Sequence, residues 1–200
     1  MKKILVLGDK GMLGNAVVKY LSENKNYIIY TLKNRWSLEN LKNFREEILE
    51  ISPEFIVNCI GKIPQKVDKD FSYEDLNVDL PIFLESLNIK IIHPSTDCEF
   101  VGVESKDFLY TKDSTRDAQD SYGQSKAKIS EIIEKEFKNT KIIRVSIIGH
   151  ELDTKLSLLD WFLNSENEVN GYDNHYWNGI TTLEWVKLCE ALLNDWDDFP

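Results

Sequence analysis

The stretch Ile4-Leu5-Val6-Leu7-Gly8-Asp9-Lys10-Gly11-Met12-Leu13-Gly14 decides the fold of this chain. A short apolar run ends at Gly8, and apolar residues at helical spacing begin at Met12, so the pattern predicts a strand, a tight turn and a helix. The G-x-x-G-x-x-G spacing is one residue looser than the dinucleotide-binding fingerprint. Gly8 would permit the turn, Gly11 would let the backbone approach a pyrophosphate, and Gly14 would let the helix pack closely. A turn without a ligand is the alternative.

The same alternation of strands and helices continues along the chain. Buried, near-continuous apolar strands that alternate with amphipathic helices are typical of a parallel sheet covered on both faces. We therefore predict an α/β fold with a doubly wound parallel sheet, the Rossmann fold, in residues 1–148. Residues 149–200 are expected to form a small, abbreviated C-terminal substrate lobe. The predicted strands are Ile4–Leu7, Tyr27–Leu32, Phe55–Ile60, Ile89–Pro94 and Lys141–Ile148, and the predicted helices are Met12–Leu21, Leu38–Ile51, Leu76–Leu87 and Tyr122–Phe137.

Composition excludes several classes of protein. The 200 residues carry a net charge of −10, which argues against a nucleic-acid partner. No apolar run approaches the ~20 residues of a membrane span. Cys59, Cys98 and Cys189 are scattered and form no Cys-x-x-Cys pair, which argues against a disulfide framework and against a zinc site. We expect a cytoplasmic protein without a metal site and without membrane association.

The last quarter of the chain is both acidic and aromatic. Residues 151–200 hold 11 acidic residues against two lysines, and four of the five tryptophans lie there. One interpretation is a solvated acidic surface over a small aromatic core. The other is a binding lobe with exposed aromatic side chains.

The segment after the second predicted strand bears on cofactor choice. An acidic residue there usually contacts the ribose hydroxyls of NAD, whereas an arginine favours the 2′-phosphate of NADP. Residues 31–36 contain no carboxylate but contain Lys33 and Arg35. The pattern favours NADP(H) over NAD(H), with Arg35 as the better candidate. The alternative is that both cations are ordinary surface charges.

Hydroxyl groups and a lysine provide a candidate set for carbonyl chemistry. Thr96 follows a predicted strand, and Tyr122 and Lys126 stand one helical turn apart. A nearby ammonium group lowers the pKa of a phenol toward the value that a general acid needs. Tyr122 would protonate a substrate oxygen, and Thr96 would orient that oxygen. The polar stretch 96–120 is predicted to be a functional loop.

These motifs resemble the extended short-chain dehydrogenases/reductases, and within them the dTDP-4-dehydrorhamnose reductase branch. That branch contains nucleotide-sugar reductases of rhamnose, capsule and O-antigen synthesis. The likeness rests on the glycine loop, on Tyr122-Gly123-Gln124-Ser125-Lys126, and on these further stretches: Asn58-Cys59-Ile60-Gly61, Ser95-Thr96-Asp97-Cys98, Arg144-Val145-Ser146-Ile147-Ile148-Gly149-His150-Glu151, Leu159-Asp160-Trp161-Phe162 and Trp177-Asn178-Gly179-Ile180-Thr181-Thr182. It implies an NAD(P)H-dependent reductase of a nucleotide-linked 4-keto-6-deoxy sugar.

The resemblance also assigns residues. It implies Thr96, Tyr122 and Lys126 as the catalytic triad, with Lys126 also binding the nicotinamide ribose. Thr96, Cys98, Tyr122, His150 and Asn178 would face the substrate, although a loop histidine and a turn asparagine are alternatives for the last two. With Arg35, the implied cofactor residues are Gly8, Gly11, Met12, Leu13, Ser37, Leu38, Cys59, Ile60, Gly61, Tyr122 and Lys126.

Three departures from the branch matter. Ser37 stands where the branch usually has an aspartate, which affects the polar contact near the adenine. Cys98 stands where related dehydratases carry a glutamate, so dehydration is not expected. The sequence also stops sooner than members of the branch usually do. A non-catalytic NADP(H)-binding or regulatory module and a sugar-nucleotide epimerase remain alternatives, and the resemblance is compatible with a homodimer.

Overall fold

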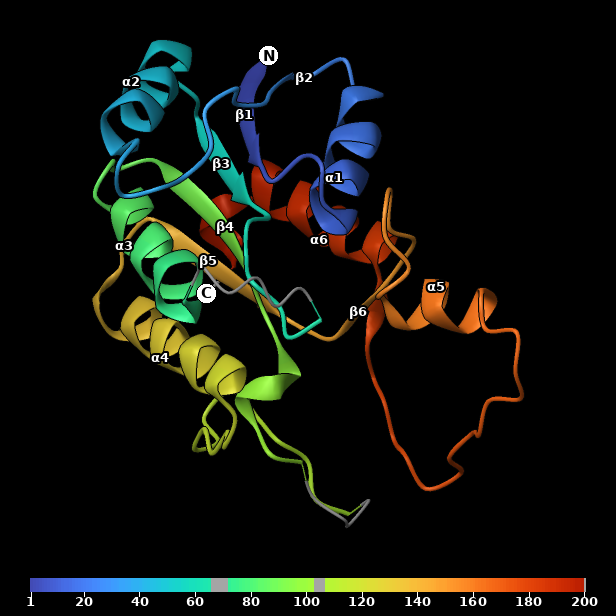
Figure 1. Cartoon of the computed structure of the whole chain (residues 1–200). Coiled ribbons are helices and arrows are strands. Elements are labelled where there is room, and N and C mark those ends of the chain that lie inside the picture. Colours follow the sequence, from blue (N-terminus) through green and yellow to red (C-terminus); the bar gives the residue numbers. More distant parts are fainter. Residues whose placement is uncertain (66–71, 103–106, 200) are drawn as a thin grey trace.

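A five-stranded parallel sheet forms the centre of the protein (Figure 1). The computed structural model describes residues 1–65, 72–102 and 107–199. The strand order is β2-β1-β3-β4-β5, and every neighbouring pair is parallel. This order confirms the doubly wound sheet, because the chain moves outward from β1 to β2 and then crosses to the other side of β1. The strands are β1 (Lys2–Leu7), β2 (Tyr27–Tyr30), β3 (Phe55–Asn58), β4 (Lys90–Ser95) and β5 (Thr140–Arg144).

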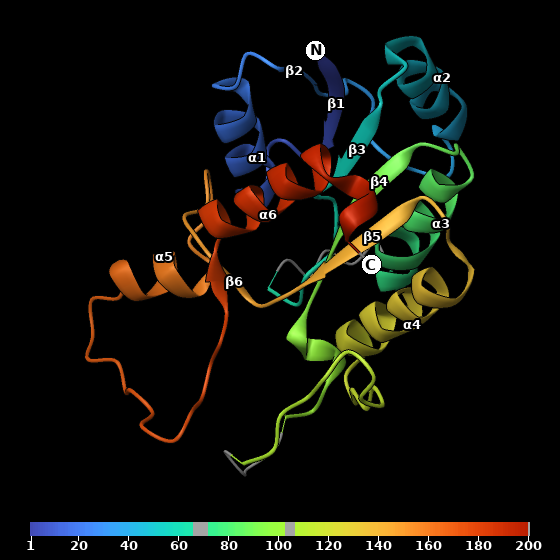
Figure 2. The same ribbon diagram turned by 180° about the vertical axis from the view of Figure 1, so that it is seen from behind.

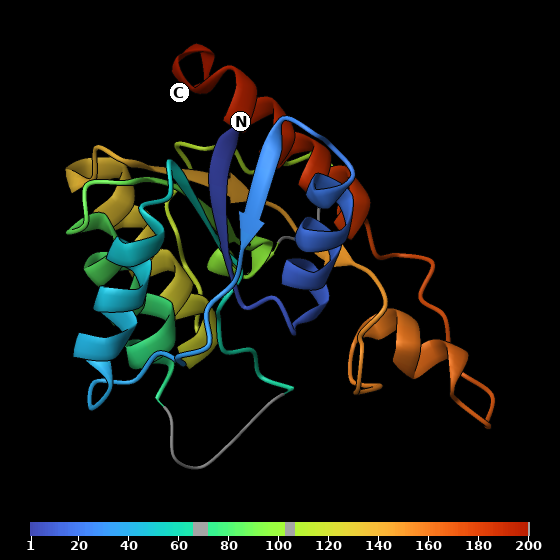
Figure 3. The same ribbon diagram turned by 90° about the horizontal axis from the view of Figure 1, so that it is seen from above.

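Helices cover both faces of this sheet, as Figure 3 shows. One face carries α1 (Met12–Ser22) and α6 (Thr182–Asn194), and the other carries α2 (Leu41–Ile51), α3 (Leu80–Glu85) and α4 (Ser121–Glu136). A π-helical turn, Asp75–Asp79, precedes α3, and 3₁₀ turns occupy Asp97–Glu99 and Trp196–Asp198. The short helix α5 (Leu158–Leu163) lies apart from the sheet in Figure 1.

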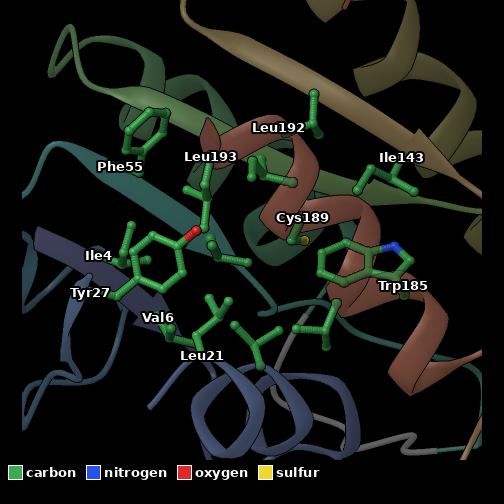
Figure 4. Packing of buried hydrophobic residues seen from close by; sticks show 14 of the residues in the cluster. Ile4, Val6, Leu21, Tyr27, Phe55, Ile143, Trp185, Cys189, Leu192 and Leu193 are labelled. Carbon is green, nitrogen blue, oxygen red and sulfur yellow. The ribbon is translucent and has the colours of Figure 1, made fainter. Parts of the chain in front are cut away.

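The apolar strands explain the two layers of core. Successive side chains of a strand point to opposite faces, so Ile4 and Val6 join one hydrophobic cluster, while Leu5 and Leu7 join the other. Figure 4 shows the first cluster, in which strand residues meet side chains of α1 and α6. The second cluster packs the opposite face of the sheet against α2 and α3.

The predicted strand Lys141–Ile148 is wrong as a single element. Its apolar run continues, but its hydrogen-bonding partner changes, because β5 ends at Arg144 and β6 (Ile147–Ile148) pairs with β7 (Ile180–Thr181) in a separate two-stranded sheet. The backbone N–H of Val145 still donates to Ser95 at 3.4 Å, whereas the carbonyl of Ser146 accepts from Ile180 at 2.9 Å. The chain therefore leaves the main sheet between these two residues.

The last quarter of the chain contributes both buried and exposed aromatic residues. Trp185 and Trp196 are buried in the first cluster, where α6 packs against α1 and the sheet (Figure 2). Trp161 and Trp177 are about half exposed, at 49% and 51%. The tryptophans thus divide into a buried pair and an exposed pair, and a binding role for the exposed pair stays a prediction. The domain boundary at residue 148 stays a prediction. Helix α6 follows this boundary in the sequence, but it packs against α1 and the first hydrophobic cluster.

Candidate functional site

The carboxyl ends of β1, β3 and β4 meet at one edge of the sheet (Figure 1). In open parallel sheets this edge, at the point where the strand order reverses, is where ligands bind. The glycine loop follows β1, Cys59-Ile60-Gly61 follows β3, and Thr96 follows β4. The topology therefore brings three of the predicted motifs to a common edge.

The glycine loop has the geometry that its spacing predicts. Gly8 has a φ of 77°, and the backbone N–H of Gly11 donates to the Gly8 carbonyl at 2.9 Å. A Cβ atom at Gly8 would lie 2.8 Å from the Cys59 carbonyl oxygen, and one at Gly14 would lie 2.2 Å from the Gly8 carbonyl oxygen. Both positions thus require glycine, the first for the turn and the second for close packing of α1.

The start of α1 presents free backbone amides. Gly11 is its N-cap residue and, as a glycine, has no side chain that could cap the helix. The N–H groups of the first helical turn have no partner within the helix, and together with the helix dipole they attract an anion. Met12 and Leu13 begin this turn. The arrangement fits a phosphate group at the end of β1.

The segment after β2 is anchored by Trp36, whose ring packs against Phe44 and Phe83 at centroid distances of 5.6 and 5.1 Å. Arg35 and Leu38, on either side of this anchor, are exposed, and the Ser37 hydroxyl accepts a hydrogen bond from the backbone of Asn40 at 3.1 Å. The anchor explains how a largely polar segment keeps a fixed path while the Arg35 side chain faces solvent.

A carboxylate that the sequence analysis missed lies near the end of β2. Glu47, from α2, accepts hydrogen bonds from the backbone of Lys33 at 2.8 Å and of Asn34 at 3.0 Å. Burial raises the pKa of Glu47, but these hydrogen bonds outweigh it and hold the pKa below its usual value. The residue is distant in sequence from β2, so the local pattern of residues 31–36 gives no sign of it.

Thr96, Cys98 and Tyr122 lie together beyond the end of β4. The Thr96 hydroxyl accepts a hydrogen bond from the Cys98 backbone at 3.2 Å and caps the turn Asp97–Glu99. The same hydroxyl is close enough to the Tyr122 phenol to lower its pKa. A Cβ atom at Gly123 would lie 2.3 Å from the Cys98 carbonyl oxygen. Gly123 therefore allows α4 to approach the turn closely enough for Tyr122 to meet Thr96.

The expected lowering of the Tyr122 pKa is wrong. Burial, followed by the nearby Cys98, raises the pKa of Tyr122 to about 12, and the hydrogen bond from Thr96 opposes this rise only in part. Lys126 is not among the principal causes of the shift. Its Nζ atom is directed instead at β4, where it donates to the Pro94 carbonyl at 2.7 Å and meets His93 Nε2 at 3.3 Å.

Lys126 is buried, and burial lowers its pKa to about 8. His93 is buried beside it and in turn contacts Asn58 of β3. Burial lowers the pKa of His93 well below its usual value, and the charge of Lys126 lowers it further. Neither His93 nor Asn58 was predicted to be a site residue, because the partner of a polar residue inside an apolar strand cannot be identified from the local sequence.

A second network fixes the loop after β4. The Glu99 carboxylate is fully buried and contacts Arg116 at 2.5 Å and Arg144 at 3.0 Å, while both arginines also contact Glu134. Hydroxyl groups of Ser95 and Ser130 donate to the same carboxylate. The backbone of residues 117 and 118 donates to the Glu99 carbonyl. The loop predicted over residues 96–120 is therefore tied to α4 and β5, with residues 103–106 outside the described part.

The model of one protein family, described as the RmlD substrate binding domain, matches residues 1–155. The chain belongs to this family. The match covers more than three quarters of the 200 residues and includes the glycine loop, Thr96, Tyr122 and Lys126. None of the curated proteins matches the chain.

Solved structures share the fold of this RmlD-family chain. A dTDP-4-dehydrorhamnose reductase from Clostridium acetobutylicum superposes with a TM-score of 0.80 at 20% identity, over 96% of this chain and 70% of that one. The Bacillus anthracis dTDP-4-dehydrorhamnose reductase in complex with NADP gives 0.62 at 21% identity, over 76% and 57%. Bordetella bronchiseptica WbmH in complex with NAD+ gives 0.69 at 14% identity, over 97% and 73%.

The remaining predicted residues are His150, which lies near the end of the family match, and Asn178, which lies beyond it. His150 is exposed, and its Nδ1 atom lies 2.8 Å from Asp160 Oδ1, while Asn178 is exposed in the loop before β7. The backbone N–H of Glu151 and the His150 ring hold the pKa of Asp160 below its usual value. In the described part of this RmlD-family chain, no hydrogen bond joins His150 or Asn178 to Thr96 or Tyr122.

Residues 1–65, 72–102 and 107–199 contain no group of three or more His, Cys, Asp or Glu side chains that could hold a metal ion. Within the same ranges, no helix has the length and the apolar character needed to cross a membrane.

Proposed function

We propose that this RmlD-family chain is an NADPH-dependent reductase of a nucleotide-linked 4-keto-6-deoxy sugar, acting in polysaccharide synthesis such as that of rhamnose, capsule or O-antigen. One observation carries the proposal: the Thr96–Tyr122 pair lies at the same sheet edge as the glycine loop. The family match and the likeness to dTDP-4-dehydrorhamnose reductases support it. The chain spans 70% and 57% of the lengths of the two reductase structures described above, so the activity of the whole protein is part of the proposal.

The cofactor would lie along the ends of β1, β2 and β3. The free amides at the start of α1 would hold its pyrophosphate, and Cys59-Ile60-Gly61 would run beside it. Arg35 would contact a 2′-phosphate, and Ser37 and Leu38 would lie near the adenine. Bound there, the nicotinamide ring supplies the hydride. A structure with NADP supports this choice only weakly, because WbmH binds NAD+ in a similar fold.

Tyr122 would donate the proton to the substrate carbonyl oxygen. Since burial raises its pKa to about 12, the phenol is neutral at physiological pH and is therefore in the proton-donating form. Thr96, which lies beside the phenol, would orient the same oxygen. Lys126, one helical turn away and with a pKa of about 8, can exchange a proton in the physiological range and would approach the nicotinamide ribose.

The contacts of Glu99 argue against dehydration as the reaction. Cys98 occupies the position at which related dehydratases carry a glutamate, and its carbonyl packs against Gly123. The next residue, Glu99, is held by two arginines and two serines. Its carboxylate is therefore committed to the loop and is not directed at a substrate.

Consumption of NADPH in the presence of candidate substrates tests the proposed function. A panel of nucleotide-linked 4-keto-6-deoxy sugars should include a member that lowers the NADPH absorbance when the protein is added. Cofactor binding without oxidation across the panel would favour a non-catalytic binding or regulatory module. Isomeric products without net consumption would favour an epimerase. A homodimer, a cytoplasmic location and the substrate contacts of Cys98, His150 and Asn178 stay predictions.

Replacing Arg35 with alanine is expected to weaken NADPH binding by about 10- to 100-fold, because a charge-assisted hydrogen bond contributes about 1.5–3 kcal/mol. NADH, which lacks the 2′-phosphate, should bind equally to both proteins. Energy transfer from tryptophan to the nicotinamide gives the affinities. Arg45→Ala, which removes another exposed arginine from nearby α2, is the matched control. Equal losses for NADPH and NADH would contradict the role assigned to Arg35.

A further inference from the structure

A buried line of polar groups connects the sheet edge to Lys126. The Ile60 backbone N–H donates to Asn58 Oδ1 at 3.1 Å, and Asn58 Nδ2 lies 3.2 Å from His93 Nδ1. On the other side of the ring, His93 Nε2 lies 3.3 Å from Lys126 Nζ, which also donates to the Pro94 carbonyl at 2.7 Å. Asn58, His93 and Lys126 are 0%, 1% and 6% exposed, so these groups depend on each other for hydrogen bonds.

The backbone fixes the direction of every bond up to the imidazole ring. An amide N–H can only donate, so the Asn58 atom that faces Ile60 must be the oxygen. The Asn58 nitrogen then faces His93, and because it too can only donate, His93 Nδ1 must accept. A neutral imidazole that accepts at Nδ1 carries its proton on Nε2. Burial keeps this ring neutral.

The proton on Nε2 then faces Lys126. An ammonium group has three donors and no acceptor, so it would place N–H against N–H, whereas a neutral amine has a lone pair that can accept. The neutral amine can still donate to the Pro94 carbonyl. Moving the His93 proton to Nδ1 would remove the conflict at Lys126, but it would create one at Asn58. Turning the Asn58 amide would only transfer that conflict to the Ile60 N–H.

We infer that Asn58 and His93 are positioning residues that set the proton balance of Lys126: Ile60 orients Asn58, Asn58 fixes the His93 tautomer, and that tautomer favours the amine of Lys126 over the ammonium. The inference rests on the proposed function, in which Lys126 belongs to the site beside Tyr122. The same hydrogen bonds link Ile60, in the segment proposed to run beside the cofactor, to this lysine. Lys126 would then exchange protons in the physiological range, which an ordinary lysine with a pKa of about 10.4 does not.

Burial and the charge of Glu99 have opposite effects on the protonation of Lys126. Burial favours the amine, whereas the Glu99 carboxylate in the turn after β4 favours the ammonium. The charge of Glu99 is in turn opposed by Arg116 and Arg144. On α4 itself, Tyr122 is neutral at physiological pH. The hydrogen-bond directions therefore add to the effect of burial and oppose the attraction from Glu99.

Asn58→Asp is the most informative variant, because it keeps the size of the side chain while removing the donor. The carboxylate would accept from both Ile60 and His93, so the His93 proton should move to Nδ1, and Nε2 should then accept from an ammonium at Lys126. We expect the Lys126 pKa to rise by at least about one unit. Asn167→Asp, in an exposed loop, adds the same charge as a control.

Nitrogen-15 NMR of the histidine rings in the cofactor-free protein reads the tautomer directly. The chain has three histidines, and the His93 signal is the one lost in His93→Gln. Carbon-13 shifts at Lys126 Cε, identified by their loss in Lys126→Met, follow the titration of the amine. Neither readout requires enzymatic activity, so failure of the proposed function would not affect them.

The expected result is an Nε2–H tautomer in the native protein and in Asn167→Asp, with Nδ1–H and a raised Lys126 pKa in Asn58→Asp. An Nδ1–H or doubly protonated His93 in the native protein would overturn the inference, even if Asn58→Asp fails to fold. An Asn58→Asp protein with an unchanged tautomer and an unchanged Lys126 titration would also overturn it.

Discussion

Replacing Tyr122 with phenylalanine is expected to lower the rate of NADPH-dependent reduction by about 10²- to 10⁴-fold, the usual contribution of a positioned general acid. The phenol lies beside Thr96, whose hydroxyl lowers its pKa. Cofactor affinity should stay within about twofold of the native value, since the glycine loop and the amides of α1 are unchanged. Steady-state kinetics and tryptophan fluorescence measure the two quantities separately.

Tyr73→Phe provides the matched control for this variant. The Tyr73 ring lies 5.8 Å from that of Tyr122, centroid to centroid, so the control removes a neighbouring phenol from the same environment. It should retain most of the native rate. Undiminished turnover in Tyr122→Phe, or an equal loss in Tyr73→Phe, would remove Tyr122 from the mechanism.

Replacing Glu99 with alanine is expected to destabilise the protein by about 3–5 kcal/mol, because it leaves buried arginines without their main counter-charge. The Arg116 and Arg144 side chains are only 8% and 17% exposed, and Glu134 alone would remain to pair with both. Urea unfolding followed by circular dichroism measures the change. Activity should fall as well, since Glu99 holds the loop that begins at Thr96.

The control for Glu99 is Glu131→Ala in α4, the helix that also carries Glu134 of the network. Glu131 forms an exposed i,i+4 pair with Lys135, and such pairs contribute only about 0.3–0.5 kcal/mol. A loss of less than about 1 kcal/mol in Glu99→Ala would show that the buried network is not a principal anchor of the loop.

The local patterns of the sequence predicted the sheet well. The glycine spacing at β1 and the period of α1 depend on neighbours within one turn, and the structure confirms both. The break between β5 and β6 escaped prediction because Val145 and Ser146 continue an apolar run while their hydrogen-bonding partners change. A partner strand more than 30 residues further along the chain decides that change, so no local pattern contains it.

The candidate site was predictable in its composition and less so in its electrostatics. One helical turn correctly brings Tyr122 and Lys126 to the same end of α4. The helical spacing does not predict that Lys126 is directed at Pro94 and His93, because both of these residues belong to β4. The network of Glu99, Arg116, Glu134 and Arg144 likewise joins residues from four separate segments. Electrostatic effects of this kind depend on the completed fold.

Transfer of deuterium from NADPH to the sugar tests the central claim most directly. The protein would be incubated with NADPH labelled at the transferable hydrogens of the nicotinamide and with a nucleotide-linked 4-keto-6-deoxy sugar, and the product would be analysed by mass spectrometry. We expect a reduced sugar that carries one deuterium, formed in proportion to the NADPH consumed. An unlabelled isomer of the substrate, or bound cofactor with no product across the panel, would contradict it.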